Sequence, residues 1–353
     1  MFLALKEIKH EKLRYSLIIA MIVLISYLIF VLTSLALGLA RQNTDAIDSW
    51  SSQRITLNQD ANINLSQSLI TKAQLAKAKL SHQEAYLGQA AVVATAKGRE
   101  KDSAQFIGLN ADQFIAQNLK LSAGHKPTTD QEIVVDTAFK EDGYKLGDYL
   151  QLNSFAKKFR IVGFTENAKL NVAPVVYGTM TAWHQLKNLG PEFAASAIVS
   201  QRNTFKVNNP QLKQYTTQTF IDKLPGYSAQ NSTFTFMIAF LMIISLIVIA
   251  VFLYILTVQK LQNYAVLRAQ GIPAKTLVNA TISQALVLVI SGLIIGTLLT
   301  AITAVAIPAS VPMAFDIPIL AAVALGLVFT GIIGALVPVR TILHVDPVSV
   351  IGG

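Results

Sequence analysis

The chain has 353 residues, a net charge of +9 and no cysteine, and 52% of its residues are hydrophobic. The absence of cysteine excludes a disulfide framework and any cysteine-based metal site. The basic residues flank long uncharged stretches instead of forming one basic surface, so we predict a membrane protein with no nucleic-acid partner.

The first uncharged stretch covers residues 15–40 and follows a basic N-terminal segment at 1–14. About 20 apolar residues are enough for a helix to cross a bilayer. The stretch is too long and starts too late for a simple signal peptide, and no small-residue cleavage site closes it. We therefore predict a transmembrane helix at 15–40.

Residues 41–232 are mostly polar and are long enough to form a core of their own. Alternating apolar residues predict strands, and residues 66–80 and 179–189 suit helices. Residues 203–222 are polar and are expected to return the chain to the membrane. The segment is thus predicted to be an α+β domain. The predicted strands cover residues 90–97, 104–109, 132–136, 148–152, 158–163 and 172–177.

Catalytic motifs are absent from the sequence. None of the five histidines belongs to an H-E-x-x-H zinc pair, and there is no G-x-S-x-G nucleophile elbow. We predict no catalytic residue and no metal site. The histidines are His10, His82, His125, His184 and His344.

Three more transmembrane helices are predicted after the polar segment, at 233–258, 278–307 and 317–339. The last two are separated by a turn at 308–316, because prolines interrupt the apolar pattern there. A tail at 340–353 follows. The expected fold is a membrane protein with four transmembrane α-helices and a large α+β extracytoplasmic domain between the first and the second.

The positive-inside rule orients this arrangement. Lysine and arginine precede the first helix, occupy the loop between the second and third, and follow the fourth, whereas the 308–316 turn has neither. We therefore expect a multi-pass protein of the cytoplasmic membrane with both termini cytoplasmic and residues 41–232 outside. The orienting residues are Lys6, Lys9, Lys12, Arg14, Lys260, Arg268, Lys275 and Arg340.

The cytoplasmic loop at 259–277 has a distinctive pattern. Apolar residues at 265–269 suit a short helix, which Gly271 ends in a C-cap position, and Pro273 opens the next helix. This predicts a helix–turn–helix elbow at the membrane surface, suited to docking a cytoplasmic partner. The alternative is a plain basic loop.

The segment Val266-Leu267-Arg268-Ala269-Gln270-Gly271 resembles the E-x-x-x-L-R-A-x-G loop of the FtsX/MacB permease family, with Asn263 or Tyr264 where an acid is common. The likeness extends to Glu132-Ile-Val-Val, Gly143-Tyr-Lys-Leu-Gly147-Asp148, Phe159-Arg-Ile-Val-Gly163 and Pro174-Val-Val-Tyr177, and to the tail around Pro338-Val-Arg340. Within that family the chain most resembles hemin-transport permeases. The segments that carry this likeness are Ala4-Leu-Lys-Glu-Ile8, Gly38-Leu-Ala-Arg-Gln-Asn43, Tyr254-Ile-Leu-Thr-Val-Gln-Lys260 and Asp346-Pro-Val-Ser-Val-Ile-Gly-Gly353.

The resemblance implies a permease subunit of an ABC transporter that acts with a second copy of itself and two copies of a separate ATPase. The chain itself lacks the G-x-x-x-x-G-K-[ST] phosphate loop, so ATP hydrolysis is expected in that partner. The residues expected to couple to the ATPase are Arg268, Gln270, Gly271, Ile272 and Lys275.

Hemin is the expected cargo, with surrounding lipid as the other membrane partner. Aromatic residues and methionines of the first two helices can stack on a planar macrocycle, and tyrosine or methionine can ligate iron. The competing interpretation is that these side chains face lipid or pack against other helices. The candidates are Met21, Tyr27, Phe30, Phe234, Met237, Phe240 and Met242.

Two other functions fit the same layout. One is a non-transporting permease that controls a cell-wall hydrolase, and the other is an exporter of antimicrobial peptides or lipophiles. The uncharged helices show no proton relay or ion path, which argues against a secondary transporter.

Overall fold

A computed structural model describes residues 11–308 and 311–343. The chain divides into two compact units: residues Leu39–Gln230, called the sheet unit, and a helical unit made of the residues before and after them. Residues 1–10, the tail from residue 344 and residues 309–310 of the predicted turn lie outside the described residues.

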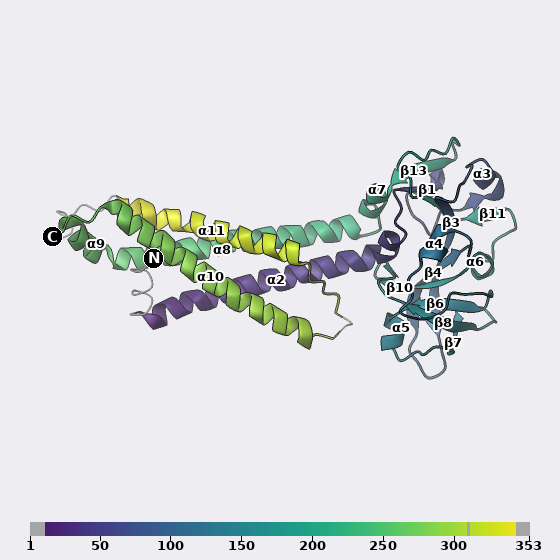
Figure 1. The fold of residues 1–353 in the computed structure, drawn as a ribbon, viewed down its shortest axis with the longest axis horizontal. Coiled ribbons are helices and arrows are strands. Elements are labelled where there is room, and N and C mark those ends of the chain that lie inside the picture. Colours follow the sequence, from purple (N-terminus) through teal and green to yellow (C-terminus); the bar gives the residue numbers. More distant parts are fainter. Residues whose placement is uncertain (1–10, 309–310, 344–353) are drawn as a thin grey trace. The chain divides into compact units, whose positions relative to one another are not determined.

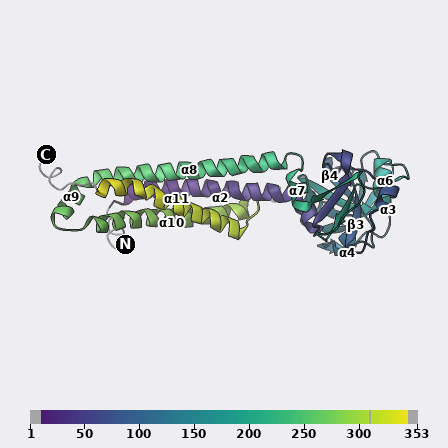
Figure 2. The ribbon, with the colours of Figure 1, turned by 90° about the horizontal axis from the view of Figure 1, so that it is seen from above.

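Four helices are long and apolar enough to cross a membrane, as predicted. They are α2 (Lys12–Ser49), α8 (Tyr227–Gln259), α10 (Ala274–Ala306) and α11 (Ile317–Leu343), and the short helix α9 (Leu261–Ala269) lies between α8 and α10. Figures 1 and 2 show the four long helices of the helical unit running alongside one another. The helices α2 and α8 extend past the predicted spans. Residues 41–49 and 227–232 are mostly polar but include no proline, so they continue these helices.

Glycines bring the helices of this unit into close contact. A Cβ atom added to Gly292 would lie 2.5 Å from Ile22 Cγ2, and one added to Gly296 would lie 2.4 Å from Ser26 Oγ. The Gly292-x-x-x-Gly296 face of α10 therefore packs directly against α2. On α11, a Cβ at Gly334 would lie 3.2 Å from the backbone nitrogen of Ala250 in α8.

Hydrogen bonds add to these contacts on the side of α2. The Tyr27 hydroxyl lies 2.9 Å from Thr303 Oγ1 of α10, and the Ala314 N–H donates to the Ser34 carbonyl at 2.9 Å. The segment just before α11 is thus hydrogen-bonded to α2. Packing and hydrogen bonds together join α2, α10 and the start of the α11 segment into one block.

The sheet unit confirms the predicted α+β domain. In the described residues, eleven strands form one sheet along the order β13-β1-β12-β3-β4-β10-β6-β8-β5, with β7 and β9 paired beside this path, and β11 and β2 form a separate pair. The strands are β1 (Arg54–Asn58), β2 (Ile70–Thr71), β3 (Glu84–Thr95), β4 (Asp102–Leu109), β5 (Ala123–Gly124), β6 (Glu132–Asp136), β7 (Tyr149–Leu152), β8 (Phe159–Thr165), β9 (Lys169–Leu170), β10 (Ala173–Thr179), β11 (Phe193–Ala195), β12 (Ala197–Ser200) and β13 (Leu212–Thr216). The helices are α3 (Lys72–Ala76), α4 (Phe114–Asn118), α5 (Ala138–Glu141), α6 (Met180–Lys187) and α7 (Thr217–Asp222), and Gln59–Ala61 form a 3-10 turn.

All six predicted strands are present as β3, β4, β6, β7, β8 and β10, and the predicted helix at 179–189 is α6. The helix predicted at 66–80 is present only in part, as the five residues of α3. Ile70 and Thr71 instead form β2, which pairs with β11, and Thr71 then caps a helix of only five residues. The pairing with a strand more than 100 residues away outweighs the local helical pattern.

Residues 203–222 were expected only to return the chain to the membrane, and the structure adds regular elements to them. Instead of a plain return to the membrane, they contain β13, which pairs antiparallel with β1 from Arg54↔Thr216 to Asn58↔Leu212, and the helix α7. The first and last strands of the sheet unit are therefore neighbours.

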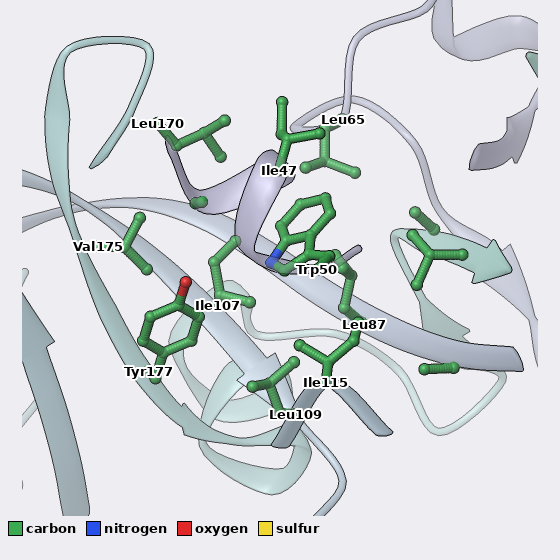
Figure 3. Close-up of a cluster of buried hydrophobic side chains, with 14 of the residues drawn as sticks. Ile47, Trp50, Leu65, Leu87, Ile107, Leu109, Ile115, Leu170, Val175 and Tyr177 are labelled. Carbon is green, nitrogen blue, oxygen red and sulfur yellow. The ribbon is translucent and has the colours of Figure 1, made fainter. Parts of the chain in front are cut away.

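The sheet has an apolar core on each face, because neighbouring residues of one strand point to opposite sides. Ile107 and Tyr177 belong to one core with Trp50, whereas Phe106 and Val176 belong to the other with Trp183. Figure 3 shows the first core, with the Trp50 ring among Ile47, Leu65 and Leu87. Trp183 of α6 packs over Gly88 of β3 and Gly108 of β4. It fits there because these residues have no Cβ atom, which would lie 2.1 and 2.7 Å from its side chain.

Candidate functional site

The elbow between α8 and α10 has the predicted geometry. Gly271 has φ +86°, and its N–H donates to the Arg268 carbonyl at 3.0 Å. The Ile272 N–H donates to the Leu267 carbonyl at 3.1 Å. These two bonds form a Schellman motif, which ends α9 and needs a residue that tolerates the left-handed conformation. Pro273 then serves as the N-cap of α10.

The five predicted coupling residues lie together on this elbow. Gln270, Gly271 and Lys275 are exposed, and the other two, Arg268 and Ile272, are half-buried. Beneath them, Tyr264 of α9 packs in an apolar cluster with Leu277 of α10 and Ile342 of α11. A short exposed turn on a packed base is a surface that a rigid partner can push against.

The sequence interpretation missed a buried polar cluster at the start of the elbow. Lys260, the residue between α8 and α9, donates from Nζ to the Tyr15 hydroxyl at 2.8 Å, and Gln284 of α10 donates to the same oxygen at 3.3 Å. A lysine next to a membrane helix is an ordinary sign of a cytoplasmic boundary, so its pattern alone gives no sign of burial.

Two of the seven candidate cargo residues lie on an open face of α8. Met237 is 40% exposed and Phe240 is 62% exposed. The sequence interpretation missed Phe236, which is 65% exposed on the same face one helical turn before Phe240. We call Phe236, Met237 and Phe240 the open α8 face.

Of the other five candidates, two lie in or against the helical core and three are half-buried. Phe30 is only 3% exposed, and Met242 packs against the same core cluster. Tyr27 is half-buried with its hydroxyl near Thr303, while Met21 and Phe234 are half-buried. The contacts of Phe30 and Met242 are those of helix packing, and contact of any of the five side chains with cargo stays a prediction.

Within residues 11–308 and 311–343, no group of three or more histidine, aspartate or glutamate side chains is placed to hold a metal ion. A cavity of about 720 Å³ in the sheet unit is lined by charges of both signs, among them Arg41, Asp48, Lys120 and Glu166. Such a lining suits water and polar groups better than an apolar macrocycle.

Two family models match the chain. Residues 16–211 match the MacB-like periplasmic core domain, and residues 235–347 match the FtsX-like permease C-terminal domain. The first match alone covers more than half of the chain.

Full-length relatives carry the name hemin transport system permease protein HrtB. One from Staphylococcus epidermidis is 24% identical over 354 residues, and one from Staphylococcus haemolyticus is 26% identical over 361 residues. Both alignments cover 100% of this chain and 99% of the relative. An uncharacterised ABC transporter permease of Mycobacterium tuberculosis is 24% identical over 66% of this chain and 65% of its own length.

Among solved structures, the periplasmic region of MacB from Actinobacillus actinomycetemcomitans aligns with a TM-score of 0.36 and 16% identity, covering 49% of this chain and 92% of that one. The extracellular domain of the Gram-positive transporter YknZ aligns with a TM-score of 0.32 and 11% identity, covering 43% and 83%. The MacB-like match covers α2 and most of the sheet unit, and the FtsX-like match covers the helices that follow. The chain therefore belongs to the FtsX/MacB family and is an ABC transporter permease.

Proposed function

We propose that this permease is the membrane subunit of an ATP-driven system that removes hemin across the cytoplasmic membrane. In this proposal two copies of the chain act with two copies of a separate ATPase. Both termini and the elbow lie in the cytoplasm, and the sheet unit lies outside. The basic residues before and at the start of α2, on the elbow and in the last turn of α11 support that orientation.

The observation that carries the cargo assignment is the open α8 face. Phe236, Met237 and Phe240 present two aromatic rings and a thioether, and the helix carries no charge from residue 227 to 259. Aromatic rings stack on planar apolar molecules, and a methionine sulfur is a haem-iron ligand. The full-length likeness to relatives named for hemin transport supports the same cargo.

The elbow is the proposed ATPase contact. Closure of the ATPase pair on ATP would push Gln270, Gly271 and Lys275, and the packed base beneath them would pass the force to the long helices. Hemin held between the open α8 faces of the two copies would then be released outward. Such a step requires that ATP binding favour the helix arrangement that releases hemin over the one that holds it.

Hemin binding to the purified permease in lipid nanodiscs tests the proposal directly. We expect the double variant Phe236→Ala, Phe240→Ala to bind hemin about 30-fold more weakly, because each lost ring contact is worth about 1 kcal/mol. The matched control is Leu325→Ala on α11, at a side chain that is 70% exposed. Absorbance of the hemin Soret band reports binding.

Growth across a hemin concentration series tests the same proposal in cells. A strain lacking the permease gene should stop growing at hemin concentrations that the complemented strain tolerates, and the double variant should fail to complement. Equal tolerance of hemin by the deletion and complemented strains would refute the cargo. The remaining candidates would then be a peptide exporter or a permease that controls a wall hydrolase.

A further inference from the structure

The Tyr15 hydroxyl is a buried meeting point of three helices. It accepts hydrogen bonds from Lys260 Nζ at 2.8 Å and from Gln284 Nε2 at 3.3 Å. Tyr15 is 1% exposed, Gln284 3% and Lys260 8%. The three side chains come from the first turn of α2, from α10 and from the junction of α8 with α9.

Lys260 occupies the joint of the elbow. Its backbone N–H donates to the Thr257 carbonyl at the end of α8 at 3.0 Å, and its own carbonyl accepts from the Tyr264 N–H of α9 at 2.9 Å. Its φ and ψ of −105° and 4° break the helix there. Any rotation of α9 against α8 therefore moves the Lys260 backbone, and with it the ammonium group bonded to Tyr15.

The chemistry of the cluster favours one fixed arrangement. A buried ammonium is costly unless hydrogen bonds replace its water, and in a low-dielectric site those bonds are strong and directional. An apolar residue would fill the same space without specifying the position of α2.

The apolar base of the elbow reaches other helices. Tyr264 packs with Leu277 of α10 and Ile342 of α11, whereas Lys260 extends the contacts of the elbow to α2. Movement of α9 thus has a direct path to α2, the first of the two helices that enter the sheet unit.

We propose that Tyr15, Lys260 and Gln284 are positioning residues that couple movement of α9 to α2. They act through the elbow and touch neither ATP nor cargo. This inference rests on the proposed function for its ATP-driven step. It adds which residues transmit that step inside the permease.

The test uses the permease in complex with its ATPase in nanodiscs, with hemin as the probe cargo. Tyr15→Phe removes only the hydroxyl. We expect the KM for ATP and the basal kcat to stay within about twofold of wild type, and hemin stimulation of kcat to fall about tenfold, within the range of measured couplings between sites. Lys260→Met should behave the same way, and Lys260→Arg, which keeps a cationic donor, should recover at least half of the stimulation.

A matched control removes a tyrosine hydroxyl elsewhere. Tyr254 lies on α8 and is 44% exposed. Tyr254→Phe should leave stimulation unchanged. If Tyr15→Phe alters the yield or melting temperature of the complex, Gln284→Met supplies a second variant that perturbs the same oxygen from α10. Stimulation retained within about twofold in Tyr15→Phe and Lys260→Met overturns the proposal.

A cargo-independent measurement separates this inference from the proposed function. The chain has no cysteine, so a single Leu28→Cys on the exposed side of α2 can carry an environment-sensitive dye. ATP should change its fluorescence in the otherwise wild-type complex and not with Tyr15→Phe added. If hemin fails to stimulate the wild type, hemin as cargo is refuted, and the dye response still decides the link. A dye response that is the same with and without Tyr15→Phe overturns it.

Discussion

The Glu84 side chain at the start of β3 is fully buried, yet it accepts hydrogen bonds from three residues. Ser81 and Ser200 donate at 2.6 and 2.7 Å, and Arg202 forms an ion pair at 2.8 Å. Burial alone would raise the pKa of the Glu84 carboxyl. The hydrogen bonds outweigh it and hold that pKa below its usual value. The carboxylate joins β3 to the last residue of β12 and to Arg202 just after it.

Replacement of Glu84 by glutamine should destabilise the sheet unit by about 2 kcal/mol at pH 7, because Arg202 loses its ionic partner. Since the folded-state pKa is lowered, the wild-type advantage is present above the unfolded pKa near 4.5 and is lost as pH falls through the folded value. Both tryptophans of the chain, Trp50 and Trp183, lie in this unit, so their fluorescence during urea unfolding measures it. Exposed Glu141→Gln is the control, and an undiminished advantage well below pH 4 would contradict the account.

The sequence predicted which segments form the membrane helices, but it did not predict which side chains of those helices are buried and which are exposed. The sequence interpretation gave equal weight to Phe30 and Phe240, and the structure buries the first and leaves the second 62% exposed. It also omitted Phe236, and it used Lys260 as a boundary charge without anticipating its burial. A helix that is apolar on every side has no polar face to mark which side packs, so contacts with other helices decide.

At the scale of elements, local signals succeeded where the chain closes its own hydrogen bonds. The elbow followed from Gly271 and Pro273, because a glycine C-cap and a proline start act within a few residues. The helix expected at 66–80 formed only in part because the partner of β2 is β11, far along the chain. The β13 strand was missed for the same reason, since its edge pairing with β1 makes a polar segment extended.

Substitution of Gly292 by leucine should separate α10 from α2, because even a Cβ atom there lies 2.5 Å from Ile22. Overpacking of this kind costs about 1–3 kcal/mol. We expect a lower melting temperature of the detergent-solubilised protein, measured by scanning fluorimetry. Ala301→Leu, at an exposed position of the same helix, adds a leucine without the clash and should leave the melting temperature unchanged. Equal effects of the two variants would show that α10 does not depend on this packing.

For the whole molecule, composition and charge order predicted the architecture well. Uncharged lengths located four helices, and the polar interval located the sheet unit, because the cost of burying charge in lipid leaves a strong mark on sequence. Orientation follows from the positive-inside rule and stays a prediction.

Single cysteines placed in the cysteine-free chain test that orientation. A cysteine at exposed Lys97 in the sheet unit should react with a membrane-impermeant maleimide in intact cells. A cysteine at exposed Lys275 on the elbow should react only after the cells are permeabilised. The unmodified chain is the blank. The reverse labelling pattern would invert the proposed topology and place the elbow outside the reach of a cytoplasmic ATPase.

The pairing of β1 with β13 has a consequence for biogenesis. These strands are the first and last of the sheet unit, and their register joins residue 54 to residue 216. Pairing of strands so far apart in sequence has a large loop-closure entropy cost, so it forms late in folding. A chain emerging from the ribosome can therefore assemble the middle of the sheet early, but β1 lacks one edge partner until residue 216 has been made. The start of α8 is synthesised only eleven residues later, so the sheet gains its last strand as the second membrane helix begins to emerge.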